Sequence, residues 1–168
     1  MLFRSGAVSV HNPNVYYGIM TDQEGNVYRT IQIGNQLWMA ENLKTTKYRN
    51  LDPIPNVTDN TAWNSLTTGA WCYLGNNSSN DCPYGKLYNW YAANDTRQIC
   101  PSGWHIPTSS DINILVSYLG GASIAGGKMK STGSDYWQSP NIGATNESGF
   151  SALSGGYRID GSFGFGVS

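Results

Sequence analysis

The fold is decided by the stretch Asn26-Val-Tyr-Arg-Thr-Ile-Gln-Ile-Gly-Asn-Gln-Leu-Trp38. Its first part is rich in β-branched and aromatic residues, which suit a half-buried strand. Gly34-Asn35 then forms a two-residue turn, and Gln36-Leu37-Trp38 forms the returning strand. The stretch therefore predicts a β-hairpin, which Met39 to Leu43 follow as a turn or as more strand.

A helix is predicted over residues 109–119. Apolar residues recur there at the spacing of one helix face: Ile112, Leu115, Val116 and Leu119. Ser109 or Ser110 can cap the start of this helix. Gly120-Gly121 ends it, because glycine tolerates the left-handed conformation. A second, weaker helix is predicted over residues 122–130, which contain another glycine pair.

The remaining segments give weaker patterns. Residues 1–20 are expected to form a lead-in segment, and residues 21–168 a single domain. The expected short elements are a helical turn at 61–66, a strand at 70–74, and a helix or half-buried turn at 84–93. Residues 131–168 are rich in Gly, Ser and Asn, which predicts loops with a few short strands.

Composition excludes several classes of function. Only 12% of the 168 residues are charged and the formal net charge is -1, so the chain lacks the basic footprint of a nucleic-acid-binding protein. The same balance argues against docking on anionic membranes, and no run of 18 apolar residues predicts a membrane span. Six Trp and eleven Tyr supply more apolar area than a disordered segment has.

Three cysteines are present: Cys72, Cys82 and Cys100. No CxxC pair occurs, and both histidines are isolated in the sequence, which argues against a zinc site. Cys72 and Cys82 bracket a polar loop that a disulfide could close, which would contribute about 2–3 kcal/mol. Two ordinary thiols are the equally weighted alternative, and in either case Cys100 is expected to be unpaired.

Seven stretches carry a resemblance to a known family. They are Asp22-Gln-Glu-Gly-Asn-Val-Tyr28, Ile33-Gly-Asn-Gln-Leu-Trp-Met-Ala-Glu-Asn-Leu43, Tyr84-Gly-Lys-Leu-Tyr-Asn-Trp-Tyr-Ala92, Cys100-Pro-Ser-Gly-Trp-His-Ile-Pro-Thr108, Gly126-Gly-Lys-Met-Lys130, Pro140-Asn-Ile-Gly-Ala-Thr-Asn-Glu-Ser-Gly-Phe150 and Leu153-Ser-Gly-Gly-Tyr-Arg158. Through them the chain resembles the Fibrobacter succinogenes major paralogous domain, over roughly residues 21–158. That family is common in surface and secreted proteins of Bacteroidetes and Fibrobacteres.

The resemblance implies a C-type-lectin-like fold of the α+β class. Such a fold has two helices, a small twisted antiparallel sheet and long loops. It also implies an extracellular or bacterial cell-surface location. The fold itself does not determine the ligand, because one architecture hosts many unrelated functions.

The chain departs from the family pattern near its end. Members usually continue after the Gly-Gly-Tyr-Arg stretch through a Trp-Trp-Ser-Ser segment to a terminal Gly-Phe-Ser-Val-Arg-Cys. Here only ten residues follow Arg158, and they contain no cysteine. The resemblance therefore implies that the partner of Cys100 and the last strands are missing. A sheet edge is expected to stay open for another chain.

Candidate ligand-binding residues are the aromatic and amide side chains beside polar loops: Trp63, Trp71, Tyr136, Trp137 and Asn141. Indole and phenol rings can stack on the apolar faces of sugars. The other tryptophans, Trp38, Trp90 and Trp104, lie inside the family motifs and are expected in the core.

A calcium site is a weaker hypothesis for the same region. Its oxygen donors would be Asp135, Asn146 and Glu147, with Asn141 nearby. The alternative is that these are loop residues whose side chains bond to their own backbone. Apart from this possible calcium, no cofactor is expected.

The leading expectation for function is a non-catalytic surface module for binding or adhesion, with a glycan or a surface protein as its partner. The alternative is a structural subunit that self-associates into fibres or fimbria-like polymers through the open sheet edge. No enzyme is expected. The related formylglycine-generating enzymes need a late cysteine pair, and residues 101–168 hold no cysteine. His105 also lacks a recognisable nucleophile in the sequence.

Overall fold

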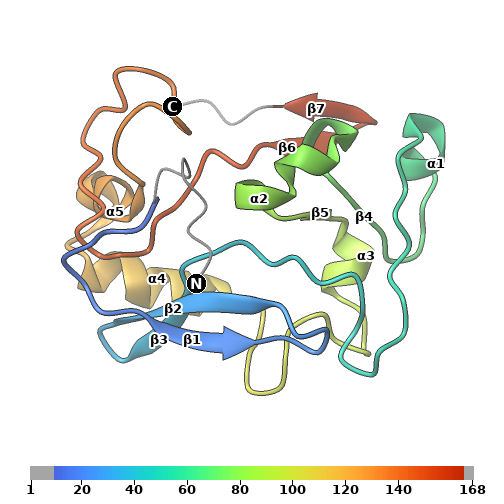
Figure 1. Ribbon diagram of the computed structural model, residues 1–168, viewed down its shortest axis with the longest axis horizontal. Coiled ribbons are helices and arrows are strands. Elements are labelled where there is room, and N and C mark those ends of the chain that lie inside the picture. Colours follow the sequence, from blue (N-terminus) through green and yellow to red (C-terminus); the bar gives the residue numbers. More distant parts are fainter. Residues whose placement is uncertain (1–9, 165–168) are drawn as a thin grey trace, which may run out of the picture.

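The computed structural model describes residues 10–164. Figure 1 shows one part formed by the first sheet with the two longest helices, and another part formed by the short middle elements and the last hairpin. The strands are β1 Gly18–Thr21, β2 Val27–Ile33, β3 Gln36–Met39, β4 Trp71–Cys72, β5 Leu87–Tyr88, β6 Tyr157–Ile159 and β7 Ser162–Gly164. The helices are α1 Asn60–Asn64, α2 Asp81–Tyr84, α3 Trp90–Ala93, α4 Ser109–Tyr118 and α5 Ala122–Met129, with 3-10 turns at Leu74–Asn76 and Ser78–Asn80.

The predicted hairpin is confirmed. β2 and β3 pair in antiparallel fashion around the Gly34-Asn35 turn, with Ile33 opposite Gln36 and Ile31 opposite Trp38. β1 pairs with the other side of β2, so the sheet has the order β1-β2-β3. This first strand was not predicted, because its four residues alternate only weakly between half-buried and exposed. The expected boundary at residue 20 falls inside β1.

The first core lies between this sheet and α4. Its buried residues are Ile31, Ile33, Trp38, Ala40, Leu115, Leu119 and Ala125, and Phe150 packs against them. The rings of Trp38 and Phe150 lie 5.7 Å apart between centroids. The helix prediction for residues 109–119 is therefore confirmed in both its place and its apolar face, except that Ile112 is exposed.

The cap of α4 lies one or two residues earlier than predicted. Thr108, rather than Ser109 or Ser110, accepts a bond from the backbone of Asp111. The Asp111 carboxylate in turn accepts from the Thr108 backbone at 2.8 Å, which completes a capping box. Gly120 and Gly121 then end the helix at φ angles of 100° and 102°, as expected.

The second core gathers around β4 and β5. Its buried residues are Tyr48, Ile54, Trp71, Ala92 and Ile99. The expectation of a helix or half-buried turn over residues 84–93 is wrong for residues 87 and 88. Leu87 and Tyr88 form β5, which pairs with β4, and only Trp90–Ala93 are helical. Asn89 separates the two elements, because its side chain accepts from the Ala92 backbone and so starts the helix there.

Arg158 ties the last hairpin to the middle of the chain. Although it is buried, its guanidinium has no carboxylate partner among residues 10–164. It donates to the Val57 and Thr58 carbonyls at 2.8 and 2.9 Å and to the Asn60 side chain at 2.8 Å. Its carbon centre lies 4.4 Å from the centroid of the Trp63 ring.

These elements confirm the α+β class, with helices beside small antiparallel sheets. Residues 157–164 form the β6–β7 hairpin, and residues 165–168 lie outside the described residues. Among the helices of the described part, none is long and apolar enough to span a membrane.

Candidate functional site

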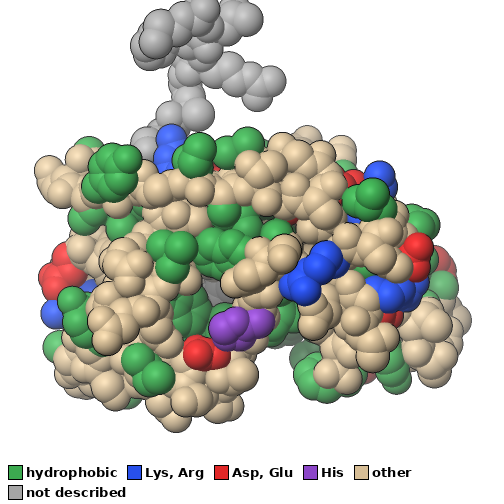
Figure 2. Space-filling model, turned by 90° about the horizontal axis from the view of Figure 1, so that it is seen from below, with side chains coloured by type: hydrophobic (Ala, Val, Ile, Leu, Met, Phe, Trp, Pro, Cys, Tyr) green, Lys and Arg blue, Asp and Glu red, His purple; other side chains and the backbone are tan. Residues whose placement is uncertain are grey.

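A cleft of about 660 Å³ lies beside the end of β3, and we call it the apolar cleft. Trp38, Met39 and Ala40 line one side of it, and Phe150 and Leu153 line another. The face in Figure 2 shows hydrophobic side chains gathered in a central hollow beside a histidine. Charged and titratable side chains also border the cleft: His11, Arg29, Glu41, Lys44 and His105.

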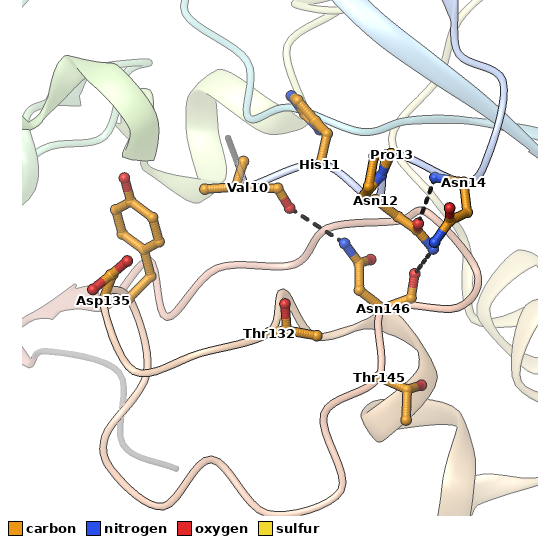
Figure 3. A pocket seen from close by; sticks show the side chains of 10 residues that line it. Val10, His11, Asn12, Pro13, Asn14, Thr132, Asp135, Thr145 and Asn146 are labelled. Carbon is orange, nitrogen blue, oxygen red and sulfur yellow. Dashed lines mark hydrogen bonds between the residues drawn. The ribbon is translucent and has the colours of Figure 1, made fainter. Parts of the chain in front are cut away.

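A second cavity of about 250 Å³, which we call the polar hollow, lies nearby and is shown in Figure 3. Its walls come from two segments far apart in the sequence, residues 10–14 and residues 132–146. Hydrogen bonds of two asparagine side chains join these segments. The Asn12 side chain donates to the Asn146 carbonyl at 2.9 Å, and the Asn146 side chain donates to the Val10 carbonyl at 3.2 Å.

Tyr136 belongs to both cavities. It also lines a further hollow of about 310 Å³ beside Trp137. The ring is half-buried and meets Tyr84 edge-on, with the centroids 6.1 Å apart. Tyr136 is one of the residues singled out from the sequence, and the structure places it where three cavities meet.

The polar hollow carries few charged groups. Amides, hydroxyls and backbone groups dominate its lining, which also includes the Asp135 carboxylate and the His11 imidazole but neither lysine nor arginine. Such a lining suits a ligand that offers many hydroxyl groups and little charge, since each amide or hydroxyl can donate or accept a hydrogen bond.

Glu41 anchors residues 10–14 at the border of the apolar cleft. Its carboxylate lies 3.2 Å from the His11 ring nitrogen and accepts from Arg29 at 3.1 Å. The hydrogen bond with His11 is the main cause that lowers the pKa of Glu41 to about 2, and Lys44 contributes through its charge. His11 also packs against Tyr17, with the ring centroids 5.1 Å apart.

We expect these contacts to make stability depend on acid pH. Because the pKa of Glu41 is lower in the folded state than its ordinary value of 4.5, its contribution is complete above about pH 4.5 and is lost as pH falls towards 2. Urea unfolding between pH 2 and 6 measures this. In the variant Glu41→Gln the pH slope should be shallower than in the unmodified chain. An identical slope in both would contradict the role given to Glu41.

The structure places the other predicted ligand-binding residues differently. Trp71 is only 7% exposed and its ring nitrogen donates to the Ile54 carbonyl, so its predicted exposure is wrong. Trp63 is half-buried against Arg158, and half-buried Trp137 donates to Ser131 and Ala152. Asn141 is buried and donates to the Ser131 and Gly133 carbonyls, which leaves its amide nitrogen no donor for a ligand.

The expected division of the remaining tryptophans is also partly wrong. Trp38 is buried, as predicted. Trp90, which was assigned to the core, is 70% exposed at the start of α3, and Trp104 is half-buried. Pairing of β5 with β4 ends at Tyr88, so the motif that contains Trp90 turns outward there.

The three proposed calcium ligands do not form one set of donors. Asp135 and Asn146 both line the polar hollow, but the Asn146 side chain is already bonded to Val10 and Ser151. Glu147 is not part of that lining and pairs with Lys128 at 2.8 Å. Within residues 10–164, no three His, Cys, Asp or Glu side chains cluster as metal ligands would.

The Cys72–Cys82 disulfide considered from the sequence is not formed. All three cysteines are free thiols: Cys72 is buried on β4, Cys82 is exposed, and Cys100 is half-buried. Cys82 lies in α2, whereas Cys72 lies on β4. Burial raises the pKa of the Cys72 and Cys100 thiols, which keeps both protonated at neutral pH.

Sequence reasoning missed the contribution of residues 10–14. They form no motif, and their partners, Glu41 and Asn146, lie 30 and 134 positions along the chain from His11 and Asn12. The only available signal was Glu41 itself, a charged residue two positions after the end of strand β3.

A family model described as the Fibrobacter succinogenes major domain matches residues 31–167. The chain belongs to this family. In this Fibrobacter succinogenes major domain the matched segment contains β3, α4 and Tyr136, whereas β1 and residues 10–14 of the polar hollow precede it. Comparison of the chain with curated proteins and with solved structures gives no match in either case.

Proposed function

We propose that this chain is a non-catalytic, extracellular binding module of C-type-lectin-like fold, and that its polar hollow and Tyr136 bind a neutral glycan. The resemblance to surface and secreted proteins supports the location. Two helices beside a small antiparallel sheet, with long loops around them, support the fold.

The observation that carries the proposal is the position of Tyr136. Its half-buried ring stands between the polar hollow and the apolar cleft, so that a ligand can meet an aromatic surface and hydrogen-bonding groups together. A sugar ring has this double character, with an apolar face and a rim of hydroxyls. Asp135 and the hydroxyls of Thr132 and Thr145 line the same hollow.

Within residues 10–164, two cysteines and a histidine that could act in catalysis are not arranged for it. Nucleophilic cysteines are normally activated by a lowered pKa, whereas burial raises the pKa of Cys72 and Cys100. His105 pairs with Asp111 at 3.1 Å, but that carboxylate is already bound by the Thr108 cap, and this histidine is largely exposed. The bonds of Asp111 to Thr108 and His105 are therefore typical of the start of a helix, which here is α4.

A glycan array that contains neutral and acidic glycans tests the proposal, followed by titration calorimetry with the best neutral binder. We expect Tyr136→Ala to weaken binding about tenfold, because stacking on an aromatic ring contributes about 1 kcal/mol beyond its buried area. Asp135→Asn should weaken it less.

Tyr118→Ala is the matched control, since Tyr118 is exposed on α4 and lines neither cavity. It should bind like the unmodified chain. An array without neutral binders, or equal binding by the Tyr136→Ala variant, would overturn the proposal.

A further inference from the structure

The outer edge of β3 carries unpaired backbone groups. In an antiparallel ladder, residues bond to the neighbouring strand in alternate pairs. The two-residue turn makes Ile33 and Gln36 a bonded pair, and Ala40 bonds to the Arg29 carbonyl at 2.9 Å. The N–H and C=O groups of Leu37 and Met39 therefore point away from β2, and no other residue of the described part bonds to them.

This edge lacks the features that normally protect a strand from pairing. Edge strands are commonly guarded by lysine, proline, a bulge or a covering segment. β3 has the sequence Gln36-Leu-Trp-Met39, with no charge and no proline. Beyond Leu37, the strand borders the apolar cleft, which Trp38, Met39 and Ala40 line.

We infer that the apolar cleft binds an extended polypeptide strand, which adds to β3 as a fourth strand of the sheet. Unpaired N–H and C=O groups in alternation match the backbone of another strand. Side chains on one face of that strand would contact Phe150, Leu153 and Pro83, which line the cleft. The inference concerns β3 and does not depend on glycan binding at the polar hollow.

The charged residues at the border of the cleft indicate which side chains the bound peptide would carry. Arg29 and Lys44 both line the cleft, and Glu41 is the carboxylate among its lining residues. Glu41 is already bonded to Arg29 and His11. A positive charge thus remains on this border, which favours a peptide that combines alternating apolar residues with an acidic end.

The probe is an acetylated and amidated peptide of eight residues, in which valine and threonine alternate before two terminal aspartates. Titration calorimetry measures its binding to the unmodified chain. Two further versions of the peptide carry N-methyl groups on alternate backbone amides. One version is methylated at the odd-numbered residues and the other at the even-numbered residues. We expect one register to weaken binding at least tenfold and the other to change it less than twofold, because only alternate amides face β3.

Replacing the two aspartates by lysines should also weaken binding several-fold, and the double variant Arg29→Gln/Lys44→Gln should remove that difference. Equal loss in both N-methyl registers, or no binding of the unmethylated peptide at millimolar concentration, would overturn the inference. So would sedimentation showing that the chain forms oligomers which the peptide does not dissociate, because a second copy would then occupy the edge.

Discussion

Replacing Gly127 by alanine is expected to destabilise the domain by about 2–3 kcal/mol, whereas the same change at Gly126 should stabilise it by up to about 1 kcal/mol. Both glycines lie within α5. A Cβ at position 127 would lie 2.2 Å from the Gly143 carbonyl oxygen, while a Cβ at position 126 would meet nothing within 4 Å. The close approach of the Gly143 backbone is therefore the reason for the opposite expected effects.

The neighbouring loop cannot easily move away from α5. The Thr145 backbone donates to the Gly127 carbonyl at 2.9 Å, and the Ser148 backbone donates to the Lys128 carbonyl at 3.1 Å. Denaturant unfolding of both variants measures the free energies. Since Thr145 lines the polar hollow, Gly127→Ala should also weaken any ligand bound there. Equal stability of the two variants would show that the loop adjusts freely.

The second large effect is expected at Arg158. Arg158→Lys should lower the free energy of unfolding by about 2–3 kcal/mol, because hydrogen bonds from a charged donor contribute about 1.5–3 kcal/mol each. Lysine cannot reproduce the planar fork that reaches Val57, Thr58 and Asn60 together, and it loses the stacked contact with Trp63.

Arg29→Lys is the matched control. Arg29 is exposed, and an exposed ion pair such as that with Glu41 contributes at most about 1 kcal/mol. Unfolding in urea, followed by tryptophan fluorescence, compares the two variants. If both variants lose the same free energy of unfolding, the contacts of Arg158 contribute no more to stability than those of a surface residue.

The sequence predicted those parts of the fold that depend on neighbours in the chain. The β2–β3 hairpin follows from strand-forming residues around Gly34-Asn35, and α4 follows from the spacing of Leu115 and Leu119. Both elements carry their own turn or stop signal. β1 has neither, because it is ordered by pairing with β2 rather than by its own four residues.

Burial of individual aromatic residues could not be predicted in this way. Trp71 follows a polar loop and was expected to be exposed, yet pairing with Tyr88 places it in the second core. Trp90 lies within a family motif, yet it is exposed because α3 starts there. The polarity of a segment depends only on neighbouring residues in the sequence. The burial of a side chain depends on which strands pair in the folded chain.

The candidate site was predicted only in part. Tyr136 was predicted as a candidate for ligand binding because it is an aromatic in a polar loop, and the structure places it at the junction of three cavities. Residues 10–14 gave no signal, because their role depends on contacts with Asn146 that only the folded chain creates.

Those contacts between the two ends of the domain have a consequence for its synthesis. Tyr17 donates to the Gly149 carbonyl across 132 positions, and Phe150 covers the core face of the hairpin beside Trp38. A ribosome releases the hairpin and α4 long before residues 149 and 150, so the part of the first core that Phe150 covers stays exposed until that segment emerges. We expect the nascent chain to be a substrate for chaperones until nearly the whole domain has emerged, and to fold slowly because its closing contacts are distant in sequence.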